Sequence, residues 1–219
     1  MRAFIAIALV SSALLGVQAT ARGQQRELPP FDIDGPIVYF IDAGTAGSAY
    51  RESDRELATW AMRAWERSSG GMLHFVPGRP DGTGAMLRVH WVPAAAGQYG
   101  EMRRTLVNGR EVASVYIRPD TDALGPDIGS AARTDALMRE TIVYLTCVHE
   151  IGHALGLSHT MNFADIMYFF GYGGDIPEFF GRYRRQLKTR DDIQRVSGLS
   201  AADTQRLLAI YRSQRPPGK

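Results

Sequence analysis

Hydrophobic and polar residues follow one another along this chain in patterns that predict both strands and helices. Three short β-prone runs predict strands at residues 37–41, 72–76 and 86–92. In the last of these, buried-type residues alternate with Arg88 and His90, as expected of a strand with one face toward a core. Apolar residues at helical spacing predict three helices, over 53–68, from Thr134 or Asp135 to Leu155, and over 200–211.

Local turn chemistry adds a hairpin to this order of elements. Asn108-Gly109 separates two β-prone runs, residues 101–107 and 110–118, and Asn-Gly favours a two-residue hairpin turn. Ser53 and Glu56 have the spacing of a capping box, which predicts the start of the first helix. Residues 119–133 read as a loop. The elements together predict one α+β domain, a sheet with helices packed against it.

The N-terminus has the parts of a secretory signal peptide. Arg2 is followed by a short apolar run, and Ala19 and Ala21 provide the small residues of a cleavage site. The apolar run contains two serines and is shorter than the roughly 20 residues that span a bilayer, so we expect no stable membrane anchor after cleavage. We therefore assign residues 1–21 to a signal peptide, with cleavage after Ala19 or Ala21, residues 22–36 to a polar lead-in segment and 37–215 to the domain.

Composition narrows the class of protein. With 219 residues, 45% of them hydrophobic and 22% charged, the chain is of ordinary globular composition. Its single cysteine, Cys147, excludes an intrachain disulfide scaffold and zinc sites built from cysteine pairs. On a helix Cys147 would point away from the face that carries His149, two residues later. We therefore expect Cys147 to be a small buried side chain and not a metal ligand. The net charge of +2 is too balanced to indicate a nucleic-acid partner.

The chemistry is concentrated in residues 149–159, HEIGHALGLSH. On a helix His149 and His153 project from one face a turn apart, where two imidazoles can share a zinc ion. Glu150 lies about 100° round the helix, so it suits a general base better than a ligand. Gly156 can end the helix, and the returning chain can bring His159 as third ligand. Three protein ligands leave a fourth position for water, as in catalytic zinc sites.

Histidines on an apolar helix could instead be ordinary core residues. However, three of the five histidines of the chain lie within these eleven residues, which favours one zinc site. The same stretch resembles the metzincin clan of zinc peptidases. Residues 164–168, ADIMY, resemble the clan's methionine turn, with Met167 as an apolar support under the metal. Tyr168 after the methionine makes the matrixins, the matrix-metalloproteinase family, the most similar.

The resemblance implies a fold and an activity. The fold is a zincin-like single domain with a twisted, mixed five-stranded sheet, three main helices, and an active-site helix followed by the Met-turn. The hairpin arm 101–107 would be the outermost strand above the cleft. The activity is that of a zinc endopeptidase, secreted or periplasmic, monomeric and acting on protein or peptide substrates. Two alternatives stay open: a secreted zinc-containing binding module, and a zinc hydrolase acting on a non-peptide bond.

Other residues refine this interpretation. Phe169 stands where some metzincins have a zinc-binding tyrosine, so a fifth protein ligand is not expected. Only His74 and His90 lie outside the motif, and we expect the matrixins' second, structural zinc to be missing. Residues 169–185 are expected to form a loop that determines specificity, with core packing as the alternative. Three aspartates lie close together in the loop before the catalytic helix: Asp120, Asp122 and Asp127. Two interpretations stay open for them, a Ca²⁺ site and a loop exposed to solvent.

Overall fold

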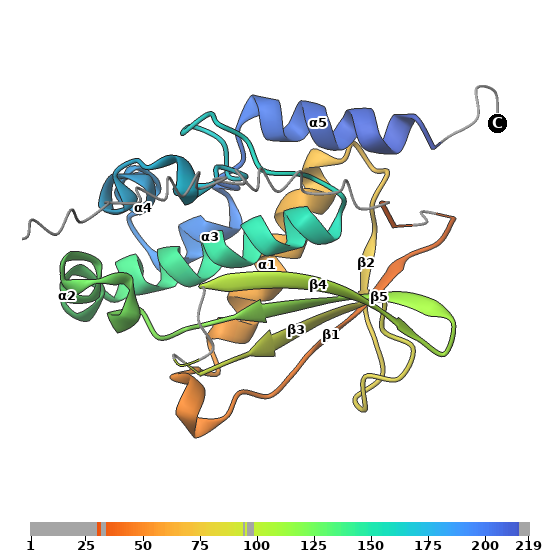
Figure 1. Cartoon of the computed structure of the whole chain (residues 1–219), viewed down its shortest axis with the longest axis horizontal. Coiled ribbons are helices and arrows are strands. Elements are labelled where there is room, and N and C mark those ends of the chain that lie inside the picture. Colours follow the sequence, from red (N-terminus) through yellow and green to blue (C-terminus); the bar gives the residue numbers. More distant parts are fainter. Residues whose placement is uncertain (1–29, 32–33, 94, 96–98, 215–219) are drawn as a thin grey trace, which may run out of the picture.

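The computed structural model describes residues 30–31, 34–93, 95 and 99–214. The predicted signal peptide and most of the lead-in segment lie outside the described residues. Within the described part the chain builds one mixed sheet with its helices gathered against it (Figure 1). The α+β prediction is therefore confirmed.

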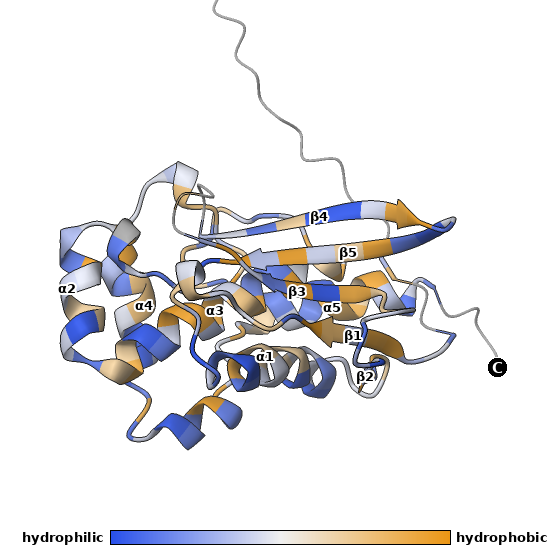
Figure 2. Cartoon of the chain, turned by 90° about the horizontal axis from the view of Figure 1, so that it is seen from below, coloured by the Kyte–Doolittle hydropathy of each residue, from blue (hydrophilic) through white to orange (hydrophobic). Residues whose placement is uncertain are grey.

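The sheet has five strands in the order β2-β1-β3-β5-β4. The first four run parallel to their neighbours, and β4 pairs antiparallel with β5. The bounds are β1 Ile37–Ile41, β2 Phe75–Pro77, β3 Leu87–Trp91, β4 Gly100–Val107 and β5 Arg110–Ile117. Each predicted strand is present, although β2 is shorter and begins later than the pattern predicts. The hairpin arm expected to be outermost is the edge strand β4, seen at the border of the sheet in Figure 2.

The three long helices agree with their predicted segments to within a residue or two. Their bounds are α1 Asp54–Ser68, α3 Ala136–Ala154 and α5 Ala201–Arg212. Two further helices of nine residues each occupy segments predicted as loops: α2 Pro126–Thr134 and α4 Ile176–Arg184. Both begin beside a proline in the first turn, which removes a backbone donor that a helix start leaves unpaired anyway. Among the described residues, no helix has the length and apolar character needed to cross a membrane.

Helices α1 and α3 pack against each other, and polar contacts in the core join them. The Trp65 indole N–H donates to the Val148 carbonyl of α3 at 2.9 Å in the core. Arg139 forms a bidentate ion pair with Asp54, at 2.6 and 2.8 Å, and both side chains are buried. Removing one partner of such a pair leaves an uncompensated buried charge, so the pair keeps α1 and α3 in one relative position.

The capping box predicted at Ser53 does not form, because the Ser53 side chain makes no cap hydrogen bond. Asp54 instead accepts a hydrogen bond from the Arg51 backbone N–H at 2.8 Å, and Glu56 pairs with Arg190. Phe31, in the segment expected to be a polar lead-in, is buried in the core. The Glu56–Arg190 pair and the contact of Phe31 with Arg104 both join residues far apart in sequence, which a local pattern does not contain.

The hairpin fixes which backbone groups of β4 face the free edge. Asn108 and Gly109 have φ of 52° and 76°, the left-handed conformation that a tight hairpin turn requires. The Arg118 N–H donates to the Tyr99 carbonyl at 2.8 Å, one step beyond the paired residues Gly100 and Ile117. Hydrogen-bonded pairs alternate in an antiparallel ladder. Odd-numbered residues of β4 therefore bond to β5, and even-numbered ones direct N–H and C=O to the free edge.

Candidate active site

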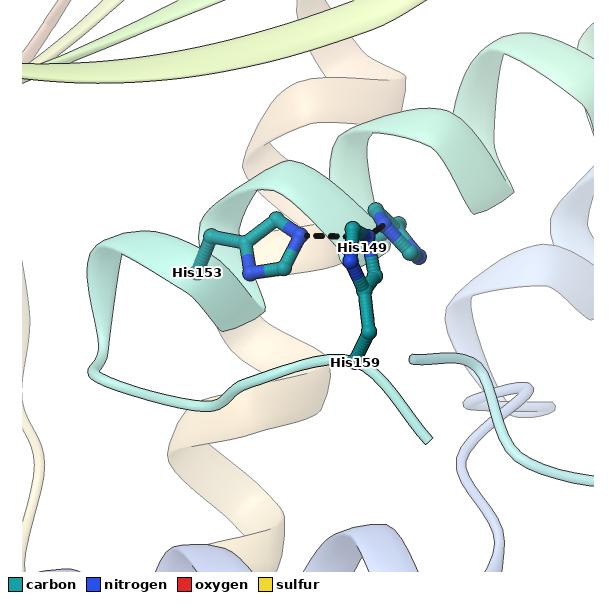
Figure 3. Close-up of side chains that lie close together, drawn as sticks. All are labelled: His149, His153 and His159. Carbon is teal, nitrogen blue, oxygen red and sulfur yellow. Dashed lines mark hydrogen bonds between the residues drawn. The ribbon is translucent and has the colours of Figure 1, made fainter. Parts of the chain in front are cut away.

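Three histidine side chains converge at the C-terminal end of α3 (Figure 3). His149 and His153 come from successive turns of the helix, and His159 comes from the chain that returns after it. Gly156 makes this return possible, since its φ of 96° is a conformation that residues with a side chain rarely adopt. The Nε2 atom of His159 lies 3.2 Å from that of His149 and 3.1 Å from that of His153.

These separations fit a zinc ion. Two nitrogens bound at roughly 2.0–2.1 Å to a tetrahedral ion are about 3.3 Å apart, close to the distances observed. Among the described residues, the triad is the only group of three or more His, Cys, Asp or Glu side chains whose ligand atoms come together. The spacing predicted from the sequence therefore places three imidazole nitrogens where one metal can be held.

Two of the imidazoles are oriented by carbonyls. The Nδ1–H of His149 donates to the Ile166 carbonyl at 2.7 Å, and that of His153 to the Leu157 carbonyl at 2.8 Å. A carbonyl only accepts, so the proton of each neutral ring sits on Nδ1 and the Nε2 lone pair is left for a metal.

Burial keeps the triad neutral in the metal-free protein. It lowers the pKa of His149 to about 3 and that of His159 to about 4, with the neighbouring His153 acting in the same direction. The pKa of His153 is lowered as well, again mainly by burial. Neutral imidazole is the form that binds a metal, because a proton occupies the same lone pair.

Glu150 is buried beside the triad, where the edge strand crosses the helix. A Cβ added at Gly100 of β4 would lie 2.5 Å from both Cγ and Oε1 of Glu150. Only glycine lets the strand approach the carboxylate so closely. Burial raises the pKa of Glu150 to about 8, and the nearby Glu101 carboxylate adds to the rise. A carboxylate with its pKa near neutrality can both accept and return a proton.

The predicted methionine turn lies beneath the histidines. Met167 is fully buried, and Gly152 of α3 packs against it so tightly that a Cβ there would lie 2.5 Å from the Met167 sulfur. The turn is joined to the chain after His159, since the Thr160 N–H donates to the Met167 carbonyl at 2.9 Å. Met167 thus packs against the residue of α3 that precedes His153, where its flexible side chain can follow the shape of the core.

The N-terminus of α5 supports this turn through residues that the sequence analysis missed. Asp203 is fully buried and accepts the Ile166 N–H at 2.8 Å, while the Ile166 carbonyl orients His149. Ser200 donates to Asp165 at 2.8 Å, and Arg206 donates to the Ser158 carbonyl at 3.0 Å. The only local signal is Ser200 followed by Asp203, a capping box that is present. Its second role needs the tertiary contact.

A cavity of about 440 Å³ opens beside the triad and runs along α3. Its walls come from α3, from the turn after Met167, from α4 and from the open end of the β4–β5 hairpin, opposite the Asn108-Gly109 turn. The segment 169–185 therefore contributes to the cavity as expected, with α4 as its main element. The lining is mostly aromatic and aliphatic: Tyr99, Gly100, Arg118, Leu145, Thr146, His149, Glu150, His159, Ile166, Tyr168, Phe169, Phe170, Phe179 and Phe180.

Within the described part of the chain, the other residues singled out in the sequence do not join the group of ligand atoms that the triad forms. His74 contacts Glu66 at 2.6 Å, and His90 contacts Asp42 and stacks on Tyr116. Cys147 is buried, and burial raises the pKa of its thiol, which keeps it protonated. Phe169 stacks on His159 with 4.7 Å between ring centroids. The three aspartates of residues 120–127 form no joint ligand group, and Asp122 pairs with Arg133.

The two arginines of β4 are both held by partners within the chain. Arg103 is held in a bidentate ion pair by Glu101, at 2.6 and 2.7 Å. The Arg104 side chain is only 7% exposed and donates to the Ala154 carbonyl at the end of α3, at 2.6 Å. Arg104 therefore connects the edge strand with the end of α3.

The chain was also compared with known proteins. A family model described as matrixin matches residues 34–197, about three quarters of the chain and all of the elements that build the site except α5. No curated protein matches the chain.

Proposed function

The chain belongs to the matrixin family, whose members are zinc-dependent peptidases, and from this premise we propose that it is an exported zinc endopeptidase. The observation that carries the proposal is the convergence of three neutral, oriented imidazoles beside a buried carboxylate, at the mouth of an apolar cavity. A binding module would need the histidines but not the carboxylate. Export rests on the signal peptide expected at residues 1–21, followed by the lead-in and the domain 37–215.

Each site residue has a proposed role. His149, His153 and His159 hold one zinc ion through Nε2, and Met167 supports them from below. A zinc ion held by these three histidines would supply Lewis-acid chemistry for the activation of water and the polarisation of the peptide carbonyl. Glu150 is the general base: it takes a proton from the attacking water and passes it to the nitrogen of the leaving amine. Burial raises the pKa of Glu150 in the metal-free protein, whereas a zinc ion held beside it would favour the carboxylate form that a general base needs.

Substrate orientation follows from the edge strand. Gly100 lies against Glu150 and directs its backbone N–H and C=O to the free edge, so an extended peptide can add there as a further strand. The side chain that follows the scissile bond then enters the cavity beside the triad. Addition in this register positions the scissile carbonyl before any chemistry occurs, which lowers the entropic cost of the reaction.

The test separates metal binding from catalysis. We expect the purified protein to cleave peptides, to stop when a chelator removes zinc, and to recover when zinc is restored. Glu150→Ala should retain zinc but lose hydrolysis, whereas His153→Ala should lose both. Zinc content and cleavage of a peptide library are measured for all three proteins. An active Glu150→Ala protein would contradict the mechanism, and N-terminal sequencing of the exported protein checks cleavage after Ala19 or Ala21.

A further inference from the structure

The three imidazoles of the triad are not held in the same way. His149 and His153 each donate a hydrogen bond from Nδ1 to a backbone carbonyl, which fixes the orientation of the ring. The Nδ1 of His159 has no such partner among the described residues, since the contacts of this imidazole within hydrogen-bond distance all involve Nε2. His159 also lies beyond the end of α3, on the returning chain. The orientation of the third ring therefore depends on contacts of another kind.

Phe169 provides such a contact. Its ring stacks on His159 with 4.7 Å between the centroids and 28° between the planes, within the range of favourable aromatic pairs. Apart from the other two histidines, it is the only ring among the described residues that contacts the imidazole of His159. The Phe169 side chain is 43% exposed, so this large apolar group is not part of the buried core.

The Phe169 ring is in turn confined by its own segment. The Phe169 N–H donates to the carbonyl of Thr160, the residue after His159, at 3.3 Å, and Tyr172 meets the Phe169 ring edge-on at 5.4 Å. A Cβ added at Gly171 would lie 2.1 Å from Cε1 and 2.4 Å from Cζ of Phe169. The ring therefore occupies the space that a side chain at residue 171 would need, and glycine at that position allows it to lie there.

From these contacts we infer that Phe169 is a positioning residue for the third metal ligand: it holds the imidazole of His159 so that its Nε2 faces those of His149 and His153. A ring that is already oriented loses less conformational freedom when a metal binds, which raises the affinity. Phe169 does for His159 what backbone carbonyls do for the other two imidazoles. The inference rests on the zinc site of the proposed peptidase, and it is tested on the metal without any substrate.

The experiment measures the Kd of the purified, metal-free protein for Zn²⁺ near neutral pH, by competition with a chromogenic chelator. Phe169→Leu keeps an apolar side chain but removes the flat ring, and it should raise the Kd about tenfold, the upper range for one aromatic contact. Phe169→Trp restores an aromatic face and should return the Kd to near the wild-type value. Phe163→Leu is the matched control and should leave the Kd unchanged, because the half-buried Phe163 ring contacts Tyr168 and Phe179 but, in the described part of the chain, no histidine.

Gly171→Ala tests the same contact without altering the ring. Its Cβ should push the Phe169 ring out of place, so this variant should also raise the Kd severalfold. In the Phe169→Leu protein the same change should add little, because the ring that it displaces is already gone. Two increases that simply multiply would show that Gly171→Ala acts by another route, which would contradict the inference.

The outcomes separate the inference from the proposed function. An unchanged Kd in Phe169→Leu overturns the inference alone, because the triad then binds zinc equally well without the ring. An equal rise in Phe163→Leu, or a rise in Phe169→Leu that Phe169→Trp does not reverse, shows a general effect on the fold and also overturns it. If the wild-type protein binds no zinc, the proposed function fails and the inference with it.

Discussion

At the scale of single residues, the site depends on Gly100 and Gly156 as much as on the histidines. The sequence already predicts that His149 and His153 share one face of a helix and that Glu150 does not. Nothing in the sequence predicts the contacts that Gly100 and Asp203 make with the site, because their partners lie 50 and 37 positions away. Such contacts follow from the approach of one element to another, and no local period encodes them.

Gly100→Ala should impair catalysis without removing the metal. The added Cβ would lie 2.5 Å from Cγ and Oε1 of Glu150, so either the carboxylate or the edge strand must move. A displacement of about 1 Å at a reacting group can lower kcat/KM about 100-fold. Gly47→Ala is the matched control, since its Cβ would meet nothing within 4 Å. Unchanged kcat/KM in Gly100→Ala would refute the close packing of β4 on Glu150.

Glu150→Gln should stabilise the metal-free protein at pH 8. The folded-state pKa of Glu150 is raised to about 8, while the unfolded chain titrates near 4.5. Between these values the folded state binds the additional proton, so its stability falls as the pH rises. Glutamine has no such dependence, and the variant should gain roughly 4 kcal/mol at pH 8 if nothing else changes. Urea unfolding at pH 5 and pH 8 measures this gain, which should be much smaller at pH 5.

At the scale of elements, hydrophobic periodicity predicts the long helices and the strands but not α2 and α4. Each has nine residues, too few turns for a helical period to stand out from a loop. The segment of α4 also contains glycine, proline and adjacent phenylalanines, a composition that favours no single element. Its helical form is stabilised by packing, since Phe179, Phe180 and Tyr183 are buried.

The edge strand offers a test of peptide addition. Met102 and Leu106 are even-numbered residues of β4 and direct their N–H groups outward, whereas Thr105 bonds to β5. Proline at Met102, two residues from Gly100, removes a donor near the triad and should raise KM for long peptides about tenfold. Leu106→Pro makes the same change near the hairpin tip and should have little effect. Equal KM values in two folded, zinc-containing variants would argue against strand addition along β4.

At the scale of the whole molecule, the order of strands could not be obtained from local patterns. The pattern predicts how many strands there are and roughly where, but in the order β2-β1-β3-β5-β4 strand β3 pairs with β1 and β5 and not with its sequence neighbours β2 and β4. The resemblance to metzincins, which the matrixin match supports, implied a mixed five-stranded sheet with the hairpin arm outermost but gave no strand order. The parallel strands and the antiparallel edge together bring the end of α3 beneath β4, so the topology itself creates the site.

Acid should weaken the folded domain through the triad. In the metal-free protein the pKa values of His149 and His159 are lowered to about 3 and about 4, whereas the unfolded chain takes up these protons near 6.5. Stability is therefore complete above pH 6.5 and is lost as the pH falls toward 4. In the Glu150→Gln variant the opposing titration of the Glu150 carboxylate is absent. The Tm of this metal-free variant should fall from pH 7 to pH 5. The fall should be smaller in a double variant in which His159 is also replaced by glutamine.

Zinc should change this pH dependence in a definite direction. A ligand that binds only the folded state stabilises it by about 4 kcal/mol at a concentration 1,000 times its Kd. Protons compete for the same Nε2 lone pairs, so the apparent Kd rises as the histidines protonate. The increase in Tm on adding zinc should consequently be large at pH 7.5 and small at pH 5. His74→Gln, a histidine outside the triad, should leave this increase unchanged, whereas His153→Ala should abolish it at both pH values. An increase of equal size in His153→Ala would place the bound zinc elsewhere and contradict the triad as the metal site.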